Sequence, residues 1–234
     1  MALDHSQTYK KLTIRNLPHI MRARSIKKAI RKLDIKNDSI YFDVGCSNGY
    51  LTQLVSDLIK AKKTTGWDHG DENLSTATSL YPKLSFQHID LNTPCSISDK
   101  ANFITCFETI EHVGNITEAI NNIDNIVTDD GKVLYTVPIE SGYIGAIKYL
   151  IKKHIFKYRL DEISKDKAVW KKYERSLYNR EDISKYRDQR DGWATHFGFD
   201  YRDFEKKLNL KYNKVNAWTS GTTRFFLIDK SLEL

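Results

Sequence analysis

The chain has 234 residues, 40% of them hydrophobic, which is enough to bury the core of a single α/β domain. No stretch approaches the roughly 18 apolar residues of a membrane span, and residues 1–6 do not resemble a secretory leader. Cys46, Cys95 and Cys106 form no CxxC pair, which argues against a disulfide framework and a metal site. We therefore expect a cytoplasmic protein with reduced thiols.

The net charge of +7 is unevenly distributed along the chain. Residues 1–36 carry 10 Lys and Arg against 2 Asp and Glu, whereas residues 37–147 carry 6 against 15. The remaining residues are basic again. Two interpretations stay open: the basic flanks are solvated helix faces, or they attract an anionic substrate.

The hydrophobic pattern predicts one basic amphipathic helix and then an alternation of strands and helices. Residues 17–33 place apolar side chains at helical spacing between basic ones. From residue 40 onward, short apolar runs predict strands over 40–44, 64–68, 84–89, 102–107 and 132–137, with helices over 50–60, 72–79 and 116–127. This alternation is typical of βαβ units and a parallel sheet.

After Pro138 the pattern changes to a long, basic and largely helical region over 141–190. Within it, residues 144–158 predict an amphipathic helix, which can be a lid over a substrate, a helix on a membrane surface, or ordinary packing. A helix over 201–209 and strands over 211–217 and 223–228 follow. A turn at 219–222 joins the two strands, so we expect an antiparallel hairpin at the end of the sheet.

Glycines and acidic residues lie where successive predicted strands end. Tyr41-Phe-Asp-Val-Gly-Cys-Ser-Asn-Gly49 runs from a strand through a glycine turn into a helix, where a ligand can approach the backbone. Asp43 is a carboxylate in an apolar strand and needs a partner. Asp68, at the next strand end, can accept hydrogen bonds from both ribose hydroxyls. Ile89 and Asp90 follow the third strand and can contact an adenine.

In these motifs, residues 40–137 resemble the class I S-adenosylmethionine-dependent methyltransferases, in particular the small-molecule branch, and residues 195–208 echo the family more loosely. The resemblance implies that S-adenosylmethionine is the cofactor and S-adenosylhomocysteine the product. The methionine part would lie at the first glycine turn, the ribose on the second strand end and the adenine on the third. The implied cofactor-binding residues are Asp43, Gly45, Cys46, Gly49, Asp68, His69, Ile89, Asp90, Phe107 and Glu108.

The family resemblance implies an α/β fold with a Rossmann-like, mostly parallel seven-stranded sheet and helices on both faces. We add to this an antiparallel C-terminal hairpin and a helical insertion after the fifth strand. We expect a single domain over 1–234. It comprises a helical extension over 1–36, a cofactor-binding core over 37–137, a helical lid over 138–192, and a C-terminal helix with the hairpin over 193–234.

A nicotinamide-dependent dehydrogenase is the nearest competitor on the same architecture. It needs a G-x-G-x-x-G turn to admit a pyrophosphate, and Gly45-Cys-Ser-Asn-Gly49 lacks one of those glycines. Asp43 would also repel a diphosphate, whereas it attracts the sulfonium cation of S-adenosylmethionine. The sign of this charge favours the methyltransferase.

The methyl group already sits on an activated leaving group, so the protein must align an acceptor and, for a hydroxyl, remove its proton. His112 and His196 are the candidate catalytic bases, although each can equally be a structural histidine. Glu108 and Glu111 are further candidates that would need a raised pKa. We expect no metal ion in the site.

The basic, aromatic insertion favours O-methylation of a small, polar or anionic acceptor such as a phosphorylated or nucleotide-linked sugar. A nucleic-acid methyltransferase is the second hypothesis, although Phe107-Glu-Thr-Ile lacks the Asn/Asp-Pro-Pro-aromatic turn of base-amine enzymes. A non-catalytic cofactor-binding protein is the third. We expect no stable nucleic-acid partner, no transmembrane segment, and at most a weak membrane-surface contact through 144–158.

Overall fold

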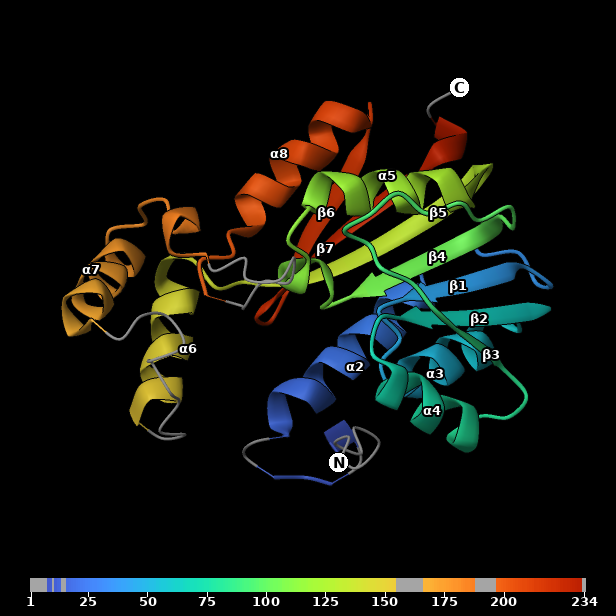
Figure 1. The fold of residues 1–234 in the computed structure, drawn as a ribbon, viewed down its shortest axis with the longest axis horizontal. Helices are drawn as coiled ribbons and strands as arrows, with labels where there is room; N and C mark the ends of the chain where they lie inside the picture. Colours follow the sequence, from blue (N-terminus) through green and yellow to red (C-terminus); the bar gives the residue numbers. More distant parts are fainter. Residues whose placement is uncertain (1–7, 10, 14–15, 155–165, 188–196, 233–234) are drawn as a thin grey trace.

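A seven-stranded sheet forms the centre of the computed structural model, which describes residues 8–9, 11–13, 16–154, 166–187 and 197–232 (Figure 1). The strand order is β3-β2-β1-β4-β5-β7-β6. β1 to β5 pair in parallel, and β7 runs antiparallel to both β5 and β6. The strands are β1 (Ile40–Val44), β2 (Lys63–Asp68), β3 (Ser85–His88), β4 (Ala101–Phe107), β5 (Val127–Pro138), β6 (Val215–Ser220) and β7 (Thr223–Asp229). The predicted Rossmann-like α/β fold is confirmed.

Helices cover both faces of the sheet, as Figure 1 shows. One face carries α2 (Leu17–Ile30), α3 (Tyr50–Ile59) and α4 (Asp71–Leu80), and the other carries α5 (Ile116–Ile126) and α8 (Tyr201–Lys211). The basic N-terminal helix α2 is part of this packing, because Ile26 and Ile30 are buried in one cluster with Tyr41 and Phe225 of the sheet. This packing fixes the position of α2 relative to the strand ends.

The C-terminal hairpin exists, but the strand predicted over 211–217 is wrong by several residues. Helix α8 continues to Lys211, and the buried Tyr212 ends it by donating its backbone N–H to the Leu208 carbonyl at 2.9 Å. The strand β6 therefore starts only at Val215. A two-residue turn follows Ser220, and Gly221 there has a φ of +60°, which glycine adopts without strain.

The predicted insertion after the fifth strand consists of α6 (Gly142–His154) and α7 (Lys167–Tyr178), which project beyond the sheet (Figure 1). The two helices share a small core in which Tyr149, Tyr173 and Phe197 are buried. The last residues of the helix predicted over 144–158 lie outside the described part of the chain. Among the helices that the structure describes, none combines the length and the apolar character needed to cross a membrane.

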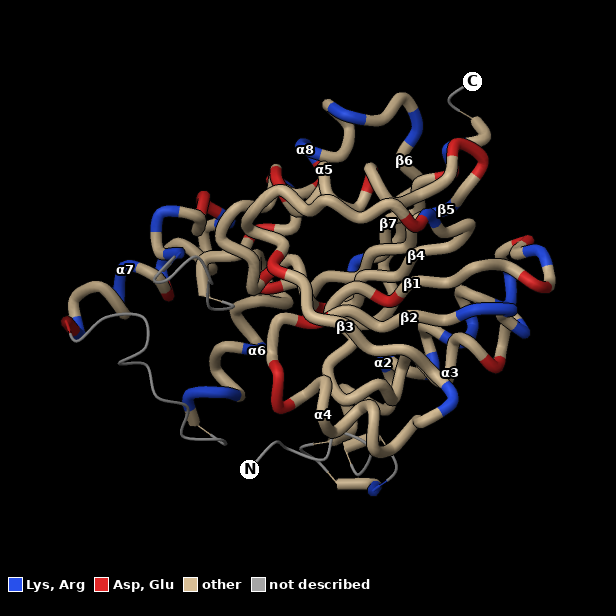
Figure 2. The backbone as a smooth tube through the Cα atoms, turned by 45° about the vertical axis from the view of Figure 1, so that its right-hand side comes forward, with Lys and Arg blue, Asp and Glu red and all other residues tan. Residues whose placement is uncertain are grey.

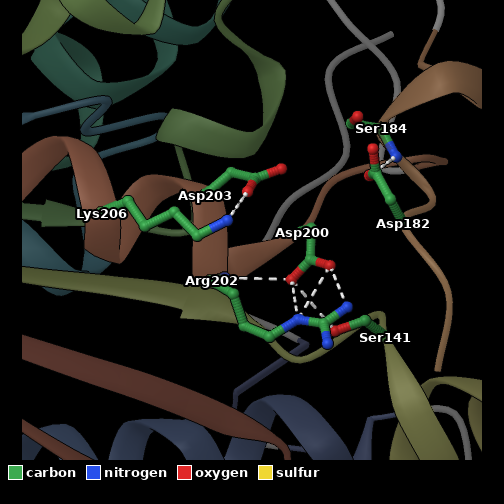
Figure 3. Close-up of polar contacts among 7 residues, drawn as sticks. All are labelled: Ser141, Asp182, Ser184, Asp200, Arg202, Asp203 and Lys206. Carbon is green, nitrogen blue, oxygen red and sulfur yellow. Dashed lines mark hydrogen bonds and ion pairs between the residues drawn. The ribbon is translucent and has the colours of Figure 1, made fainter.

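The two ends of the insertion meet at one buried carboxylate, Asp200 (Figure 3). The Ser141 hydroxyl, just before α6, donates to its Oδ1 at 3.2 Å. The same oxygen accepts the backbone N–H of Arg202 at 3.0 Å and so caps α8. The Arg202 guanidinium adds an ion pair. Asp200 therefore fixes where the insertion leaves the sheet and where it returns.

Candidate functional site

The glycine turn after β1 lies against the segment that follows β4. Gly45 and Gly49 have φ values of +81° and +79°, and Gly49 is the N-cap of α3. A Cβ atom on Gly45 would come within 1.9 Å of the Thr109 hydroxyl oxygen. The turn thus needs glycine at residue 45 both for its backbone angles and for its contact with the neighbouring strand end.

Asp43 is buried directly below this turn, and its predicted need for a partner is met by two hydroxyls. Oδ2 accepts from Thr52 at 2.6 Å and Oδ1 accepts from Thr105 at 2.7 Å. Burial raises the pKa of Asp43 to about 6, against the two hydrogen bonds, which lower it. The carboxyl group therefore loses its proton in the folded protein at a higher pH than in the unfolded chain.

This raised pKa predicts a pH-dependent gain in stability for Asp43→Asn. Folding favours the protonated form of Asp43. Its contribution to the stability of the fold is therefore complete below about pH 4 and is lost as the pH rises through about 6. An amide cannot ionise, so we expect Asp43→Asn to raise the free energy of unfolding by up to about 3 kcal/mol at pH 8 and by only about 1 kcal/mol at pH 4.5. Urea unfolding at both pH values measures this difference. The exposed Asp57→Asn is the control, and an equal loss of stability at both pH values would contradict the prediction.

Asp68 ends β2 beside the turn, as the sequence predicted. Its Oδ2 accepts the backbone N–H of Ser47 at 2.8 Å, and its Oδ1 accepts that of Gly70 at 2.9 Å. Cys46, also in the turn, is buried, and burial raises the pKa of its thiol, so the thiol stays protonated. His69 is exposed next to Asp68. The carboxylate of Asp68 therefore joins two strand ends through backbone amides.

The third strand end lies next to Asp68. The backbone N–H of Ile89 donates to the Asp68 carbonyl at 3.0 Å, and the Ile89 side chain is buried in the core. Asp90 accepts from the backbone and side-chain nitrogens of Asn92 at 2.9 and 3.0 Å, which shapes the following turn. Phe107, at the end of β4, is buried on the face covered by α2. These strand ends thus share one edge of the sheet.

Glu108, the residue after β4, pairs with an arginine that the sequence prediction missed. Its Oε2 lies 2.7 Å from Nη2 of Arg22 on α2, and its φ of +50° is unusual for a residue other than glycine. Burial raises the pKa of Glu108, and the Arg22 guanidinium opposes this shift. Arg22 stands one turn before the buried Ile26, and a cation near the apolar face of an amphipathic helix was the available signal.

The candidate bases follow in the 3₁₀ turn η1 (Ile110–His112). Glu111 is fully buried, and burial together with the charge of Glu108 raises its pKa well above the usual range. His112 is partly exposed in the same turn. Nη2 of Arg187, from the end of the insertion, donates to the carbonyl oxygens of Glu111 at 3.0 Å and Val113 at 2.8 Å. His196 lies outside the described residues.

The sequence prediction also missed Glu140, a residue that follows β5 and faces α6. It is buried and pairs with Lys148 at 2.7 Å and Lys152 at 3.3 Å. The charges of Glu140 and Lys148 both influence the pKa of Glu108, which places α6 and α2 around the same strand end. Figure 2 shows Asp and Glu positions between the sheet and α6, with many Lys and Arg positions at the periphery.

This arrangement fits S-adenosylmethionine. Carboxylates of Asp43, Asp68 and Glu108 surround a glycine turn, which suits a sulfonium cation and a ribose and disfavours a diphosphate. The left-handed Gly45 and Gly49 leave the turn without side chains at two positions.

Comparison with known proteins agrees with this assignment. Residues 17–186 match the family model described as a methyltransferase domain. A putative methyltransferase, 235L of Invertebrate iridescent virus 6, is 25% identical over 134 residues, which are 57% of this chain. The chain spans 50% of the length of that relative.

Solved structures show the same fold over nearly the whole chain. Magnesium protoporphyrin IX methyltransferase (ChlM) from Synechocystis PCC 6803, with bound SAH, has a TM-score of 0.58 at 11% identity and covers 95% of this chain and 90% of its own. The plantazolicin methyltransferase BpumL, in complex with a triazolic analog and SAH, has a TM-score of 0.61 at 13% identity over 96% and 88%. The PH0226 protein from Pyrococcus horikoshii OT3 has a TM-score of 0.59 at 14% identity over 95% and 98%. These findings confirm the predicted family: the chain belongs to the methyltransferase domain family, whose class I members use S-adenosylmethionine as methyl donor.

Proposed function

We propose that this chain transfers the methyl group of S-adenosylmethionine to a hydroxyl oxygen of a small polar or anionic acceptor, such as a phosphorylated or nucleotide-linked sugar. The donor supplies a methyl group on a sulfonium leaving group, and S-adenosylhomocysteine is the product. A cytoplasmic location, where the three free cysteines stay reduced, remains part of this proposal.

For the donor we propose the roles that the resemblance implies. The turn over 45–49 and Asp43 hold the methionine part, Asp68 accepts from the ribose hydroxyls, and Ile89 with Asp90 frames the adenine. The convergence of three strand ends on one edge supports this assignment, because ligands of such sheets bind at the carboxyl ends of the strands. Phe107 and Glu108 complete the site from β4.

The observation that carries the anionic acceptor is the exposed basic face of α2. Five cationic side chains, from the second half of α2 and the two residues after it, border a surface hollow of about 450 Å³: Arg24, Lys27, Lys28, Arg31 and Lys32. No ion pair joins any of them to an acidic residue in the described part of the chain. The same helix delivers Arg22 to Glu108 at the strand end. A positive surface on the helix that carries Arg22 favours an anionic substrate by long-range attraction.

A hydroxyl acceptor must lose a proton during transfer, and we propose His112 as the group that receives it. Its place in the 3₁₀ turn after β4 and its partial exposure support this role. Glu111 is the alternative within the same turn; it is fully buried, and burial raises the pKa of its carboxyl group. His196 stays a candidate from the sequence alone.

A panel of acceptors tests the proposal. We expect S-adenosylhomocysteine release with sugar phosphates or nucleotide-linked sugars and little with neutral phenols or quinones. Activity confined to the neutral, lipophilic acceptors would contradict it. A short oligoribonucleotide belongs in the panel, because the basic face of α2 also favours the second hypothesis, a nucleic-acid acceptor.

Charge reversal on α2 tests the role of this surface. The triple variant Lys27→Glu, Lys28→Glu and Lys32→Glu is expected to raise KM for the anionic acceptor about tenfold or more, with unchanged affinity for S-adenosylmethionine. The matched control reverses three exposed lysines that stand just before β2, β3 and β4 and do not border the hollow on α2: Lys62, Lys83 and Lys100. Equal effects of the two triple variants would show that only net charge matters.

A further inference from the structure

Two exposed apolar side chains and a row of cations lie on one side of α2. Leu17 and Met21 are large and apolar, yet they are 43% and 52% exposed. Together with Arg24 and Lys28 they follow one another at intervals of four, three and four residues, which places them on one side of the helix. We call this side the outer face of α2, because the buried residues of the helix lie opposite and pack against the sheet.

The cations of the outer face have no acidic neighbours along the helix. The sequence between residues 16 and 33 contains no Asp or Glu. Within the part of the chain that the structure describes, no ion pair joins a carboxylate to any of the five cations that border the hollow on α2. Like charges three or four residues apart on a helix repel each other and destabilise it. A bound polyanion removes this repulsion, so the face suits an anionic partner.

The apolar side chains distinguish between the candidate anionic partners. A soluble anion is held by the cations alone and gains nothing from Leu17 and Met21. A nucleic-acid strand combines cations with stacked aromatic rings, and the outer face has Leu and Met in their place. A membrane surface uses both kinds of side chain, since anionic headgroups attract Lys and Arg while Leu and Met enter the boundary of the acyl chains. The composition of the face therefore favours anionic lipid.

Helix α6 is the alternative membrane contact, because it also exposes large apolar side chains. Ile147 and Ile151 on this helix are 59% and 40% exposed. Its three lysines, however, are all paired within the protein, with Glu140 or Glu174. An apolar face whose cations are already neutralised does not select anionic lipid. The charges therefore favour α2 over α6.

We propose that the outer face of α2 docks the protein on the surface of an anionic membrane. Leu17 and Met21 enter the boundary between headgroups and acyl chains, and the five cations contact lipid phosphates. This docking goes beyond the proposed function, since it requires neither the methyl donor nor the acceptor. Arg22, the residue after Met21, pairs with Glu108 at the end of β4, so the start of α2 connects the docked face to the candidate site.

Co-sedimentation with lipid vesicles tests the docking on the wild-type protein. The vesicles contain phosphatidylcholine alone or with about one third phosphatidylglycerol, and partition into the anionic vesicles is expected to be about thirtyfold stronger or more. Raising the salt concentration to about 1 M, where the Debye length is about 3 Å, should remove most of this preference. Equal binding to both kinds of vesicle, or binding to neither, would overturn the proposal.

Charge reversal assigns the electrostatic part of the binding to the outer face. The triple variant Lys27→Glu, Lys28→Glu and Lys32→Glu should weaken partition into the anionic vesicles about thirtyfold or more. The control triple described above, with lysines just before β2, β3 and β4, removes the same net charge. It should stay within about threefold of the wild type, because salt screens distant charges. A control triple that binds as weakly as the α2 triple would refute the assignment to α2.

The double variant Leu17→Gln and Met21→Gln tests the apolar part. It should weaken partition about tenfold and keep the preference for anionic vesicles, because only apolar contact area is lost. The matched control is Leu80→Gln with Leu210→Gln, which changes apolar side chains exposed on α4 and α8 and should bind like the wild type. If the double variant on α2 also binds like the wild type, no side chain of α2 enters the bilayer and the proposal is wrong.

The remaining outcomes separate the alternatives. If Ile147→Gln with Ile151→Gln abolishes vesicle binding and the double variant on α2 keeps it, α6 is the membrane contact and the proposal fails. Binding of a short oligoribonucleotide without any binding to anionic vesicles would assign the cations to a nucleic acid instead. Vesicle binding without release of S-adenosylhomocysteine from any acceptor would support the docking and count only against the proposed function.

Discussion

Gly45→Ala is expected to lower the free energy of unfolding by about 3 kcal/mol or more and to abolish donor binding. The added Cβ would come within 1.9 Å of the Thr109 hydroxyl oxygen and 2.7 Å of its Cβ. Overpacking of this kind costs about 1–3 kcal/mol, and a left-handed backbone adds roughly 1–2 kcal/mol for a residue with a side chain. Gly45 has a φ of +81°, so both effects act together. Urea unfolding and titration with S-adenosylmethionine measure them.

Two further variants separate these effects. Gly221→Ala changes a hairpin glycine with a φ of +60° whose added Cβ meets nothing within 4 Å, so only the backbone cost of about 1 kcal/mol should appear. Adding Thr109→Gly to Gly45→Ala should restore the part of the lost stability that comes from the close contact with Thr109. If Gly45→Ala lowers the free energy of unfolding no more than Gly221→Ala does, the Thr109 side chain can move away from the added Cβ at no cost.

Asp68→Ala is expected to weaken the binding of S-adenosylmethionine and S-adenosylhomocysteine by about 1–3 kcal/mol, roughly fivefold to 150-fold. On the proposed role of Asp68, the variant removes the acceptor for the ribose hydroxyls, and the N–H groups of Ser47 and Gly70 also lose their acceptor. Asp68→Asn keeps one oxygen, so its loss should be smaller. Titration calorimetry measures the affinity of the wild type and of both variants for each ligand.

An acidic residue nearby provides the control for this experiment. Asp71 is exposed in the first turn of α4, and Asp71→Ala removes the same charge without touching the turn after β1. Its donor affinity should stay within about twofold of the wild type. Unchanged affinity in Asp68→Ala would mean that the ribose is bound elsewhere on the sheet edge.

The sequence was sufficient to predict which strand ends meet. Strands in a parallel sheet direct their carboxyl ends to one edge, so the order of apolar runs was enough to bring Gly45, Asp68 and Ile89 together. The prediction of a strand over 211–217 was wrong because Tyr212 fits a strand pattern as well as a helix end. Only the folded structure shows that it is buried at the end of α8.

The sequence could not predict which helices bring cations to the site. Arg22 and Lys148 stand in basic helices among many similar residues, and the one local signal, a cation near the apolar face of α2, does not identify its partner. Their ion pairs with Glu108 and Glu140 depend on how α2 and α6 pack against the sheet. The pairing of these charges is a tertiary property, whereas the glycine turn is a local one.

The hydrogen bond between Ser141 and Asp200 joins the start of the insertion to the residue that follows its end. The proposed donor residues all precede residue 141, and the segment from 142 to 199 begins and ends at one anchored point. Because the entropy of closing a loop grows slowly with its length, such a segment can lengthen, shorten or be exchanged at small thermodynamic cost. On our proposal that the donor is held by residues up to 108, the insertion can change in length and sequence while the donor site stays constant.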